Sequence, residues 1–283
     1  MKNNFENPIH NPEKQEKEIS ETDIYPIANL PLQQRYDRIA SQWNTEIYEG
    51  TRRDDLIPLL IDSSEMKDGM VALEAMCGTG LLSAELKKRF PKSKVYALDF
   101  SRGMLNAVEG EIHKVQSSIL AMPFSEQSFD RIFLRSAIYD LPRRAQLKAL
   151  QEIKRILKES GIFTLQTYYT TTETQEVLNN IVNIKDLASG QYQDMGKEFP
   201  RYFATDEELE KWFTEAGFKF SKLQSFEGVI RYLQTKEMTE IGQSMWVEYI
   251  EKLSKEMQNA IKLRREDNGS LVYNFPGAVY KLS

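Results

Sequence analysis

Short apolar runs alternate with amphipathic helical stretches through the middle of the chain. The runs with the length and composition of buried strands are Val71–Met76, Lys94–Asp99, a segment around Val115, Arg131–Leu134 and Ile162–Leu165. Helical periodicity fills the intervals at Leu81–Phe90, from Ser101 to about Glu109, and at Arg143–Lys158. Strands separated by such helices pair in parallel, with helices on both faces of the sheet. The pattern therefore predicts an α/β fold with an open, doubly wound, mostly parallel sheet.

The chain before the first strand divides into a tail and a helical region. Residues 1–26 are predicted to be a flexible tail, because apolar side chains there are too sparse to form a buried face. From Leu32 to Leu60 the pattern is helical, and its apolar positions, Tyr36 and Trp43 among them, recur at spacings of three and four. We therefore assign residues 27–283 to one domain.

Beyond Thr167 the alternation of strands and helices changes. Thr205 is predicted to begin a helix that ends at Gly217, and Glu208 completes the pattern of a capping box. The elements predicted after it are a strand at Phe218–Phe226, a long amphipathic helix from about Lys236 to Leu263, a turn at Asn268–Gly269 and a strand pair within Leu271–Leu282. Segments 168–203 and 231–266 are predicted to form a helical lid, with Trp246 as a core residue.

The composition excludes several classes of protein. Over 283 residues, 41% hydrophobic and 28% charged positions exclude a disordered or fibrous chain. The net charge of −5, without a Lys/Arg-rich stripe, argues against a nucleic-acid partner. One cysteine and two histidines exclude a disulfide framework and a Cys/His zinc cluster, so no metal is expected. Because neither a signal peptide nor a membrane-spanning apolar run is found, we expect a cytoplasmic protein without membrane association.

The segment Glu74–Gly80 follows the first predicted strand, where open parallel sheets bind nucleotides. Ser83 stands where a dinucleotide fingerprint has its third glycine, so that fingerprint is incomplete. Asp99 ends the second predicted strand, and a carboxylate there can accept hydrogen bonds from both hydroxyls of a ribose. The spacing therefore predicts a nucleoside ligand.

Four sequence motifs follow one another through about half of the chain. They are Ala72–Gly80, Leu98–Leu105, Met122–Phe124 with Ser128–Asp130, and Glu152–Lys158 with Gly161. At these residues the sequence resembles the class I S-adenosylmethionine-dependent methyltransferases. The resemblance implies an enzyme with a Rossmann-like, seven-stranded methyltransferase fold and S-adenosyl-L-methionine as its cofactor.

The resemblance also implies roles for individual residues. It places Glu74 and the glycine backbone at the methionine part, Asp99 at the ribose, and Tyr36 over the sulfonium. The family usually has Asp at the position of Ser118 and Gly at that of Met76, so this sequence departs from the pattern twice. The cofactor-binding residues that the resemblance implies are Tyr36, Glu74, Ala75, Cys77, Gly78, Gly80, Asp99, Phe100, Met104, Ser118, Ile119 and Arg135.

Candidate catalytic residues follow the fourth predicted strand, where the family has its reaction face. Tyr139 could orient a methyl acceptor and Asp140 could take its proton. Asp140 could equally cap the following helix. Cys77 at a helix N-terminus could be a nucleophile, but without a histidine near it in sequence we favour a small residue of the cofactor turn.

The sequence therefore predicts a cytoplasmic S-adenosylmethionine-dependent methyltransferase that acts on a small molecule. The predicted reaction is methylation of a nitrogen or oxygen atom of that acceptor. Two alternatives are methylation of a peptide or tRNA, and a non-catalytic relative that only binds the nucleoside. The identity of the acceptor and the oligomeric state are not encoded in any pattern recognised in the sequence.

Overall fold

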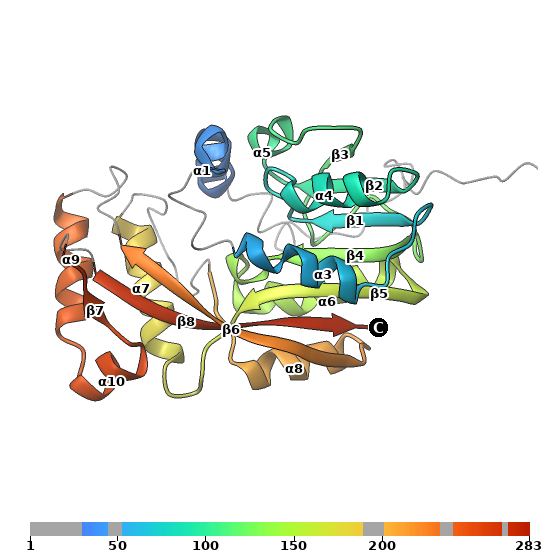
Figure 1. The fold of residues 1–283 in the computed structure, drawn as a ribbon. Coiled ribbons are helices and arrows are strands. Elements are labelled where there is room, and N and C mark those ends of the chain that lie inside the picture. The colour runs from blue at the N-terminus through green and yellow to red at the C-terminus, as the bar shows by residue number, and fades with distance from the viewer. Residues whose placement is uncertain (1–29, 45–52, 189–200, 233–239, 268–270) are drawn as a thin grey trace, which may run out of the picture.

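A mixed sheet forms the centre of the molecule (Figure 1). The computed structural model describes residues 30–44, 53–188, 201–232, 240–267 and 271–283. The strand order is β3-β2-β1-β4-β5-β8-β6, and β7 pairs with β8 beside this path. The strands are β1 (Val71–Ala75), β2 (Lys94–Asp99), β3 (His113–Gln116), β4 (Phe129–Arg135), β5 (Leu157–Tyr168), β6 (Phe220–Tyr232), β7 (Arg264–Arg265) and β8 (Leu271–Leu282). Strands β1 to β5 pair in parallel, whereas β8 runs antiparallel to both β5 and β6, which confirms the predicted fold class.

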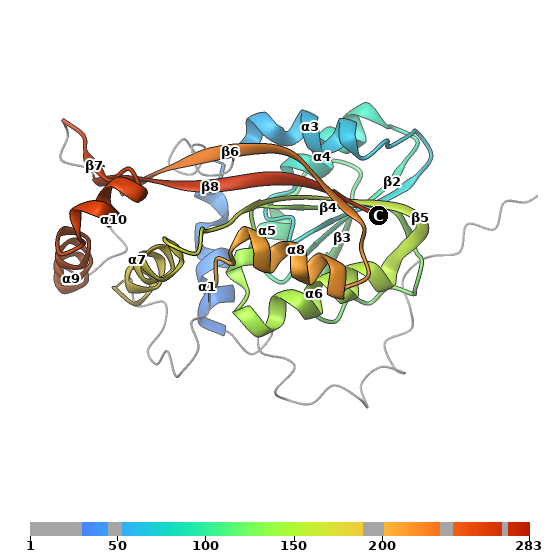
Figure 2. The same ribbon diagram turned by 90° about the horizontal axis from the view of Figure 1, so that it is seen from below.

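Helices cover both faces of this sheet (Figure 2). On one face α3 (Ile57–Ser63) and α4 (Leu81–Arg89) bury Leu60 and Leu86. On the other, α6 (Arg143–Ile156) and α8 (Asp206–Glu215) bury Leu150 and Trp212. The remaining helices are α1 (Leu30–Ile39), α5 (Arg102–Asn106), α7 (Gln175–Ala188), α9 (Glu240–Glu251) and α10 (Lys255–Ala260), with 3-10 turns η3 (Ala40–Gln42), η4 (Asp54–Leu56) and η5 (Ile138–Asp140).

A long antiparallel ribbon of β6 and β8 extends beyond the parallel strands and carries α7, α9 and α10 at its far end (Figure 1). There α7 packs against α9. Trp246 of α9 is completely buried, as predicted, and its indole Nε1 donates to the Ile181 carbonyl oxygen at 2.9 Å. Within the described ranges, none of the helices combines the length and hydropathy that a bilayer span requires.

Several predicted boundaries are confirmed. The capping box at Thr205 and Glu208 is present, with both reciprocal hydrogen bonds. The helix before the fifth strand begins at Arg143, as the sequence predicts, and ends at Ile156. One helix is shorter than predicted: the helix after Asp99 ends at Asn106 rather than at about Glu109. The predicted tail and the turn at Asn268–Gly269 lie outside the described residues.

The helical region predicted at Leu32–Leu60 contains α1 and η3, then η4 and α3, and residues 45–52 between them lie outside the described ranges. Two predictions of continuity or pairing are wrong. The helix predicted from Lys236 to Leu263 divides into α9 and α10, because the Ser254 hydroxyl accepts from Met257 N and caps a new helix. The predicted strand pair is one strand, β8, since Pro276–Gly277 continues the ladder with β6.

Candidate functional site

The first strand ends in a buried carboxylate and a turn rich in left-handed backbone. Glu74 is 2% exposed, and its Oε2 accepts from the Ser83 N–H at 2.8 Å and the Ser83 hydroxyl at 2.6 Å. Ser83, which breaks the dinucleotide pattern, is therefore the residue that anchors Glu74 at the start of α4. Burial raises the pKa of the Glu74 carboxyl, and the positive charge of Arg135 opposes that shift.

The backbone conformation of the turn after β1 explains why glycines stand at positions 78 and 80. Met76, Gly78 and Gly80 have φ angles of 53°, 54° and 74°, a region that side chains disfavour. A Cβ on Gly80 would lie 2.9 Å from both methyl carbons of Val108, and one on Gly78 would lie 3.5 Å from the Trp43 Nε1. Met76 adopts the left-handed conformation at a position where the family that this sequence resembles usually has glycine. The backbone at Met76 is therefore locally strained.

Cys77 has the environment of a packed turn residue. Its side chain is 6% exposed. Burial, reinforced by the charges of Asp99 and Glu74, raises the pKa of the thiol well above its ordinary value. A thiol that remains protonated at neutral pH is a poor nucleophile, which favours the turn interpretation of Cys77.

Asp99 lies at the tip of β2, directly beside that turn. Its Oδ2 accepts from Gly78 N and its Oδ1 from Ser101 N, each at 2.9 Å. Burial raises the pKa of Asp99 to about 6, against the lowering effect of these two N–H groups. The structure thus brings together Glu74, the glycine turn and Asp99 at the carboxyl edge of neighbouring parallel strands.

An aromatic cluster from α1 and η3 lies over the tip of β2. The Tyr36 ring packs edge-on against Phe100, with centroids 5.9 Å apart, and against Trp43 at 5.6 Å. Met104 of α5 is buried in the same cluster. Trp43 was not predicted as a site residue, because its place in the apolar helical stripe gave it the pattern of an ordinary core position.

Asp37 docks α1 onto the start of α5. Its Oδ1 accepts from the Ser101 hydroxyl at 2.6 Å and from Gly103 N at 2.7 Å. A Cβ on Gly103 would lie 2.6 Å from the Asp37 Cα, so the two helices approach as closely as only a glycine allows. This contact fixes the aromatic cluster relative to Asp99.

The residues predicted at the adenine edge lie after β3. Ser118 and Ile119 are each 3% exposed. The Ser118 hydroxyl accepts from Leu120 N at 3.2 Å, whereas Ile119 packs in the core between the sheet and α6. The neighbouring Ser117 N donates to the Asp99 carbonyl oxygen at 3.1 Å, which holds this turn beside the tip of β2.

The predicted reaction face is η5, and it is connected to distant segments. The Tyr36 hydroxyl donates to Asp140 Oδ2 at 2.7 Å, so Asp140 meets the residue predicted over the sulfonium. Asp140 is not the cap of α6, whose N-cap residue is Pro142. The Tyr139 ring stacks on Phe203 with centroids 4.5 Å apart, and burial raises the pKa of its hydroxyl. Arg135 at the end of β4 pairs with Asp54 at 2.6 Å.

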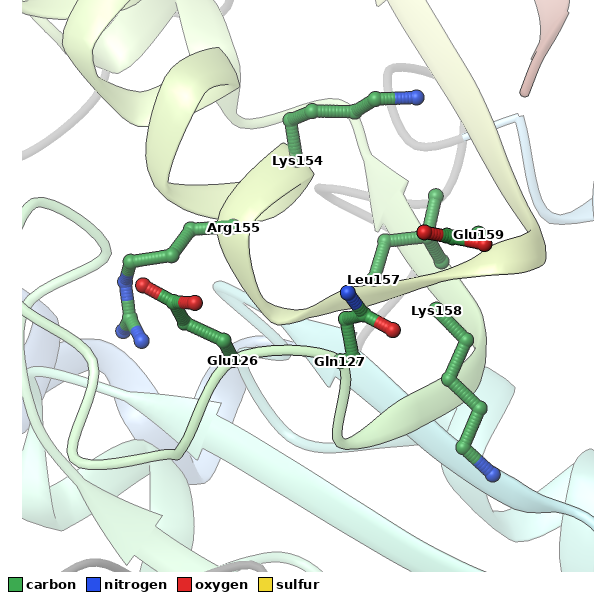
Figure 3. A pocket seen from close by; sticks show the side chains of 7 residues that line it. All are labelled: Glu126, Gln127, Lys154, Arg155, Leu157, Lys158 and Glu159. Carbon is green, nitrogen blue, oxygen red and sulfur yellow. The ribbon is translucent and has the colours of Figure 1, made fainter.

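A hollow lies where α6 leads into β5, near the amino ends of β4 and β5 (Figure 3). Arg155 there pairs with Glu152, Lys158 pairs with Asp130, and the Lys154 ammonium lies 4.8 Å from the centroid of the Phe218 ring. The cationic side chains that line the hollow therefore already have partners. None of its lining residues belongs to the group around Asp99. Its lining residues are Glu126, Gln127, Lys154, Arg155, Leu157, Lys158 and Glu159.

The residues around Asp99 fit a nucleoside cofactor with an amino-acid tail. A buried carboxylate with a raised pKa gains from hydroxyl donors. Glycine at positions 78 and 80 allows the left-handed backbone of the turn, which directs the Gly78 N–H at Asp99. The aromatic faces of Tyr36, Phe100 and Trp43 suit a cationic sulfur and a planar base.

Comparison with known proteins agrees with this chemistry. Residues 72–161 match the family model described as a methyltransferase domain. The demethylmenaquinone methyltransferase of Staphylococcus haemolyticus is 24% identical over 221 residues, covering 70% of this chain and 86% of that protein. The enzyme of that name from Anoxybacillus flavithermus is 22% identical over 210 residues, covering 71% and 82%. The crystal structure of the YcgJ protein of Bacillus subtilis shares the fold, with a TM-score of 0.67, 18% identity, and coverage of 81% of this chain and 97% of that one.

Fold, site and sequence matches thus define a methyltransferase with a Rossmann-like sheet. The protein is an S-adenosylmethionine-dependent methyltransferase that is similar in fold and motifs to the class I family, and S-adenosyl-L-methionine is its cofactor.

Proposed function

We propose that this enzyme transfers a methyl group to a small-molecule acceptor, with the transfer site between Asp99 and the Tyr139–Asp140 turn. The observation that carries the proposal is the buried Asp99 carboxylate, paired with Gly78 N at 2.9 Å under the Tyr36 cluster. The names of the bacterial relatives, which act on demethylmenaquinone, support a small ring-bearing acceptor. The choice of nitrogen or oxygen as the methylated atom stays a prediction.

In this proposal the residues of the two strand tips bind the cofactor. Asp99 accepts the ribose hydroxyls, and Glu74 with the Gly78 and Gly80 turn holds the methionine part. The bound cofactor supplies an activated methyl group on a sulfonium. The Tyr36 ring attracts that positive charge by roughly 0.5–2 kcal/mol, and the cover formed by α1 excludes water from the reaction.

Remaining contacts with the cofactor are proposed for side chains beside these tips. Phe100 and Met104 would contact one face of the adenine. The turn that follows β3 would contact its edge through Ser118 and Ile119. Ala75 and Cys77 would contribute backbone, and Arg135 its charge near Glu74, consistent with its effect on the pKa of that carboxyl.

Tyr139 and Asp140 are proposed to act on the acceptor. Aligning the two reacting groups can supply as much as ~7–11 kcal/mol, so orientation is the main requirement. Tyr139 is in place to stack with a planar acceptor, as it does with Phe203. Asp140 Oδ2 already accepts from Tyr36, so Asp140 takes a proton only when the acceptor replaces one of its present partners.

Calorimetry with S-adenosylhomocysteine tests the assignment of Asp99. We expect micromolar binding by the natural protein and a loss of tenfold or more in Asp99→Ala, because hydrogen bonds to a charged group contribute about 1.5–3 kcal/mol each. Glu109→Ala, which removes an exposed acid after α5, is the control and keeps the natural affinity. Equal affinities of the Asp99→Ala and natural proteins would contradict the proposed site.

Transfer of a tritiated methyl group to mixed acceptor pools tests the class of substrate. We expect label in the small-molecule fraction rather than in tRNA or peptides, since the net charge of −5 disfavours RNA. Label confined to a macromolecular fraction would overturn the small-molecule proposal, whereas binding without transfer to any pool would favour a non-catalytic role.

A further inference from the structure

Three polar side chains, those of Tyr36, Asp140 and Arg201, contact one another in a triangle beside the aromatic cluster. Tyr36 of α1 donates its hydroxyl to Asp140 Oδ2 at 2.7 Å. Arg201 Nε lies 3.0 Å from Asp140 Oδ1 in an ion pair. Arg201 Nη2 donates a hydrogen bond to the Tyr36 hydroxyl oxygen at 3.3 Å. The Arg201 and Asp140 side chains are only 15% and 12% exposed. Three segments far apart in sequence therefore meet at one ion pair.

Amide side chains of α7 hold the segment that carries Arg201. Asn179 Nδ2 donates to the Phe203 carbonyl oxygen at 3.0 Å, and Asn179 Oδ1 accepts from Phe203 N at 2.8 Å. Asn183 Nδ2 donates to the Arg201 carbonyl oxygen at 3.3 Å. Residues four apart lie on one face of a helix, so α7 presents these two amides side by side to the backbone of residues 201–203.

The same segment is also bonded to the reaction face. Tyr202 N donates to the Tyr139 carbonyl oxygen at 3.0 Å, and Phe203 stacks on the Tyr139 ring. Residues 201–203 thus lie between α7 and η5, with backbone hydrogen bonds to both. The position of Arg201 relative to Asp140 is therefore set by contacts with α7 as well as with η5.

Charges of the triangle reach the proposed cofactor site. The carboxylate of Asp140 contributes to raising the pKa of Asp99, and Arg201 and Arg35 act to lower the pKa of the Tyr36 hydroxyl, which burial raises. A change in charge at Asp140 or Arg201 therefore acts on Tyr36, the residue proposed to lie over the sulfonium, and a change at Asp140 acts on Asp99 as well.

We propose that Arg201 is a positioning residue of this methyltransferase: it holds Asp140 against Tyr36 and balances the Asp140 charge beside the sulfonium, and α7 sets its place. This inference rests on the proposed function, since it assumes cofactor binding at Asp99. It has a consequence that needs no acceptor. The cofactor is cationic at sulfur whereas S-adenosylhomocysteine is not, so the ratio of their affinities reports the local charge.

Calorimetric Kd values for both ligands test the proposal. In Arg201→Met the ratio should shift toward the cationic cofactor by roughly fivefold or more, the size expected for charges a few ångströms apart in partly screened surroundings. Asp140→Asn should shift the ratio in the opposite direction, and the double variant should return it to within about twofold of the natural value. Arg201→Lys keeps the charge and should retain most of the natural ratio.

Arg143→Met is the matched control, because Arg143 pairs with Glu208 next to the same segment but outside the triangle. It should leave the ratio unchanged. Asn183→Leu, which removes the hydrogen bond from α7 to Arg201, should shift the ratio in the same direction as Arg201→Met and by less.

If Arg201→Met weakens both ligands equally, the role of Arg201 is only structural and the inference fails. If Arg201→Met shifts the affinity ratio but Asn183→Leu leaves it unchanged, the role assigned to α7 is wrong. Failure of the natural protein to bind either ligand would instead remove the proposed cofactor site, so the two failures are distinguishable.

Discussion

Asp99 shows how burial and hydrogen bonding oppose each other in one carboxylate. Backbone N–H groups of Gly78 and Ser101 favour its charged form, but burial raises the pKa from 3.8 to about 6. The folded protein therefore holds this proton more tightly than the unfolded chain does, so Asp99 makes the fold less stable as the pH rises from 3.8 to about 6. Hydroxyl donors from a ligand would offset that cost.

The raised pKa of Asp99 predicts a pH dependence of ligand binding. Only the ionised carboxylate accepts two hydroxyl donors, so S-adenosylhomocysteine affinity should fall about tenfold between pH 7 and pH 5, as a pKa of about 6 requires. Calorimetry across this range measures it. Asp99→Asn should bind weakly with little pH dependence; an equally steep pH profile in that variant would assign the effect to another group.

At the scale of elements, the site depends on how closely α1 approaches α5. Asp37 accepts hydrogen bonds from both Ser101 and Gly103. Ser101 is also the N-cap of α5, where its hydroxyl accepts from Met104 N at 3.1 Å. One short helix thus holds the Asp99 loop, the aromatic cluster and the cover helix in a single arrangement.

Gly103→Ala tests the importance of that approach. The added Cβ would lie 2.6 Å from the Asp37 Cα and 2.8 Å from its carbonyl oxygen, so α1 must shift. Overpacking of this kind costs about 1–3 kcal/mol, and we expect S-adenosylhomocysteine to bind about tenfold more weakly, measured by calorimetry. Arg102→Ala, at the exposed neighbouring position of α5, should keep the natural affinity. Natural affinity in Gly103→Ala would mean that α1 does not cover the ligand.

At the scale of the whole molecule, the β6–β8 ribbon connects two packing units. Its proximal half pairs with β5 in the central sheet, and its distal half carries α7, α9 and α10 (Figure 1). Trp246 joins α9 to α7 through full burial and the hydrogen bond to Ile181. Since α7 also hydrogen-bonds to residues 201–203, which bond in turn to η5, contacts run from the end of the ribbon to the predicted reaction face.

Trp246→Ala should loosen this distal unit. Removing a buried Trp costs about 3–5 kcal/mol, and hydrogen exchange should become faster in α7 and α9 while β1 to β4 remain protected. Trp246→Phe, which keeps an aromatic ring but loses the donor to Ile181, should cost about 1 kcal/mol. Uniformly faster exchange over the parallel strands would contradict a local role.

Local patterns in the sequence were sufficient to predict the parallel strands of the sheet. Strands β1 to β5 and the capping box at Thr205 follow from apolar periodicity and cap chemistry, which act over a few residues. The division at Ser254 was missed because the amphipathic period continues across it. Strand β8 was predicted as a pair, although Gly277 continues the strand and lies against the Phe226 ring, where a Cβ would come within 2.4 Å.

The sequence by itself determined the carboxylates and glycines at the strand tips, because adjacent parallel strands necessarily bring their carboxyl ends together. Only the tertiary structure decided the partners of these groups. Tyr36 meets Asp140 across 104 residues of chain and Arg201 across 165. No local pattern identifies such partners, since an arginine that is buried against a carboxylate looks the same in sequence as one in solvent.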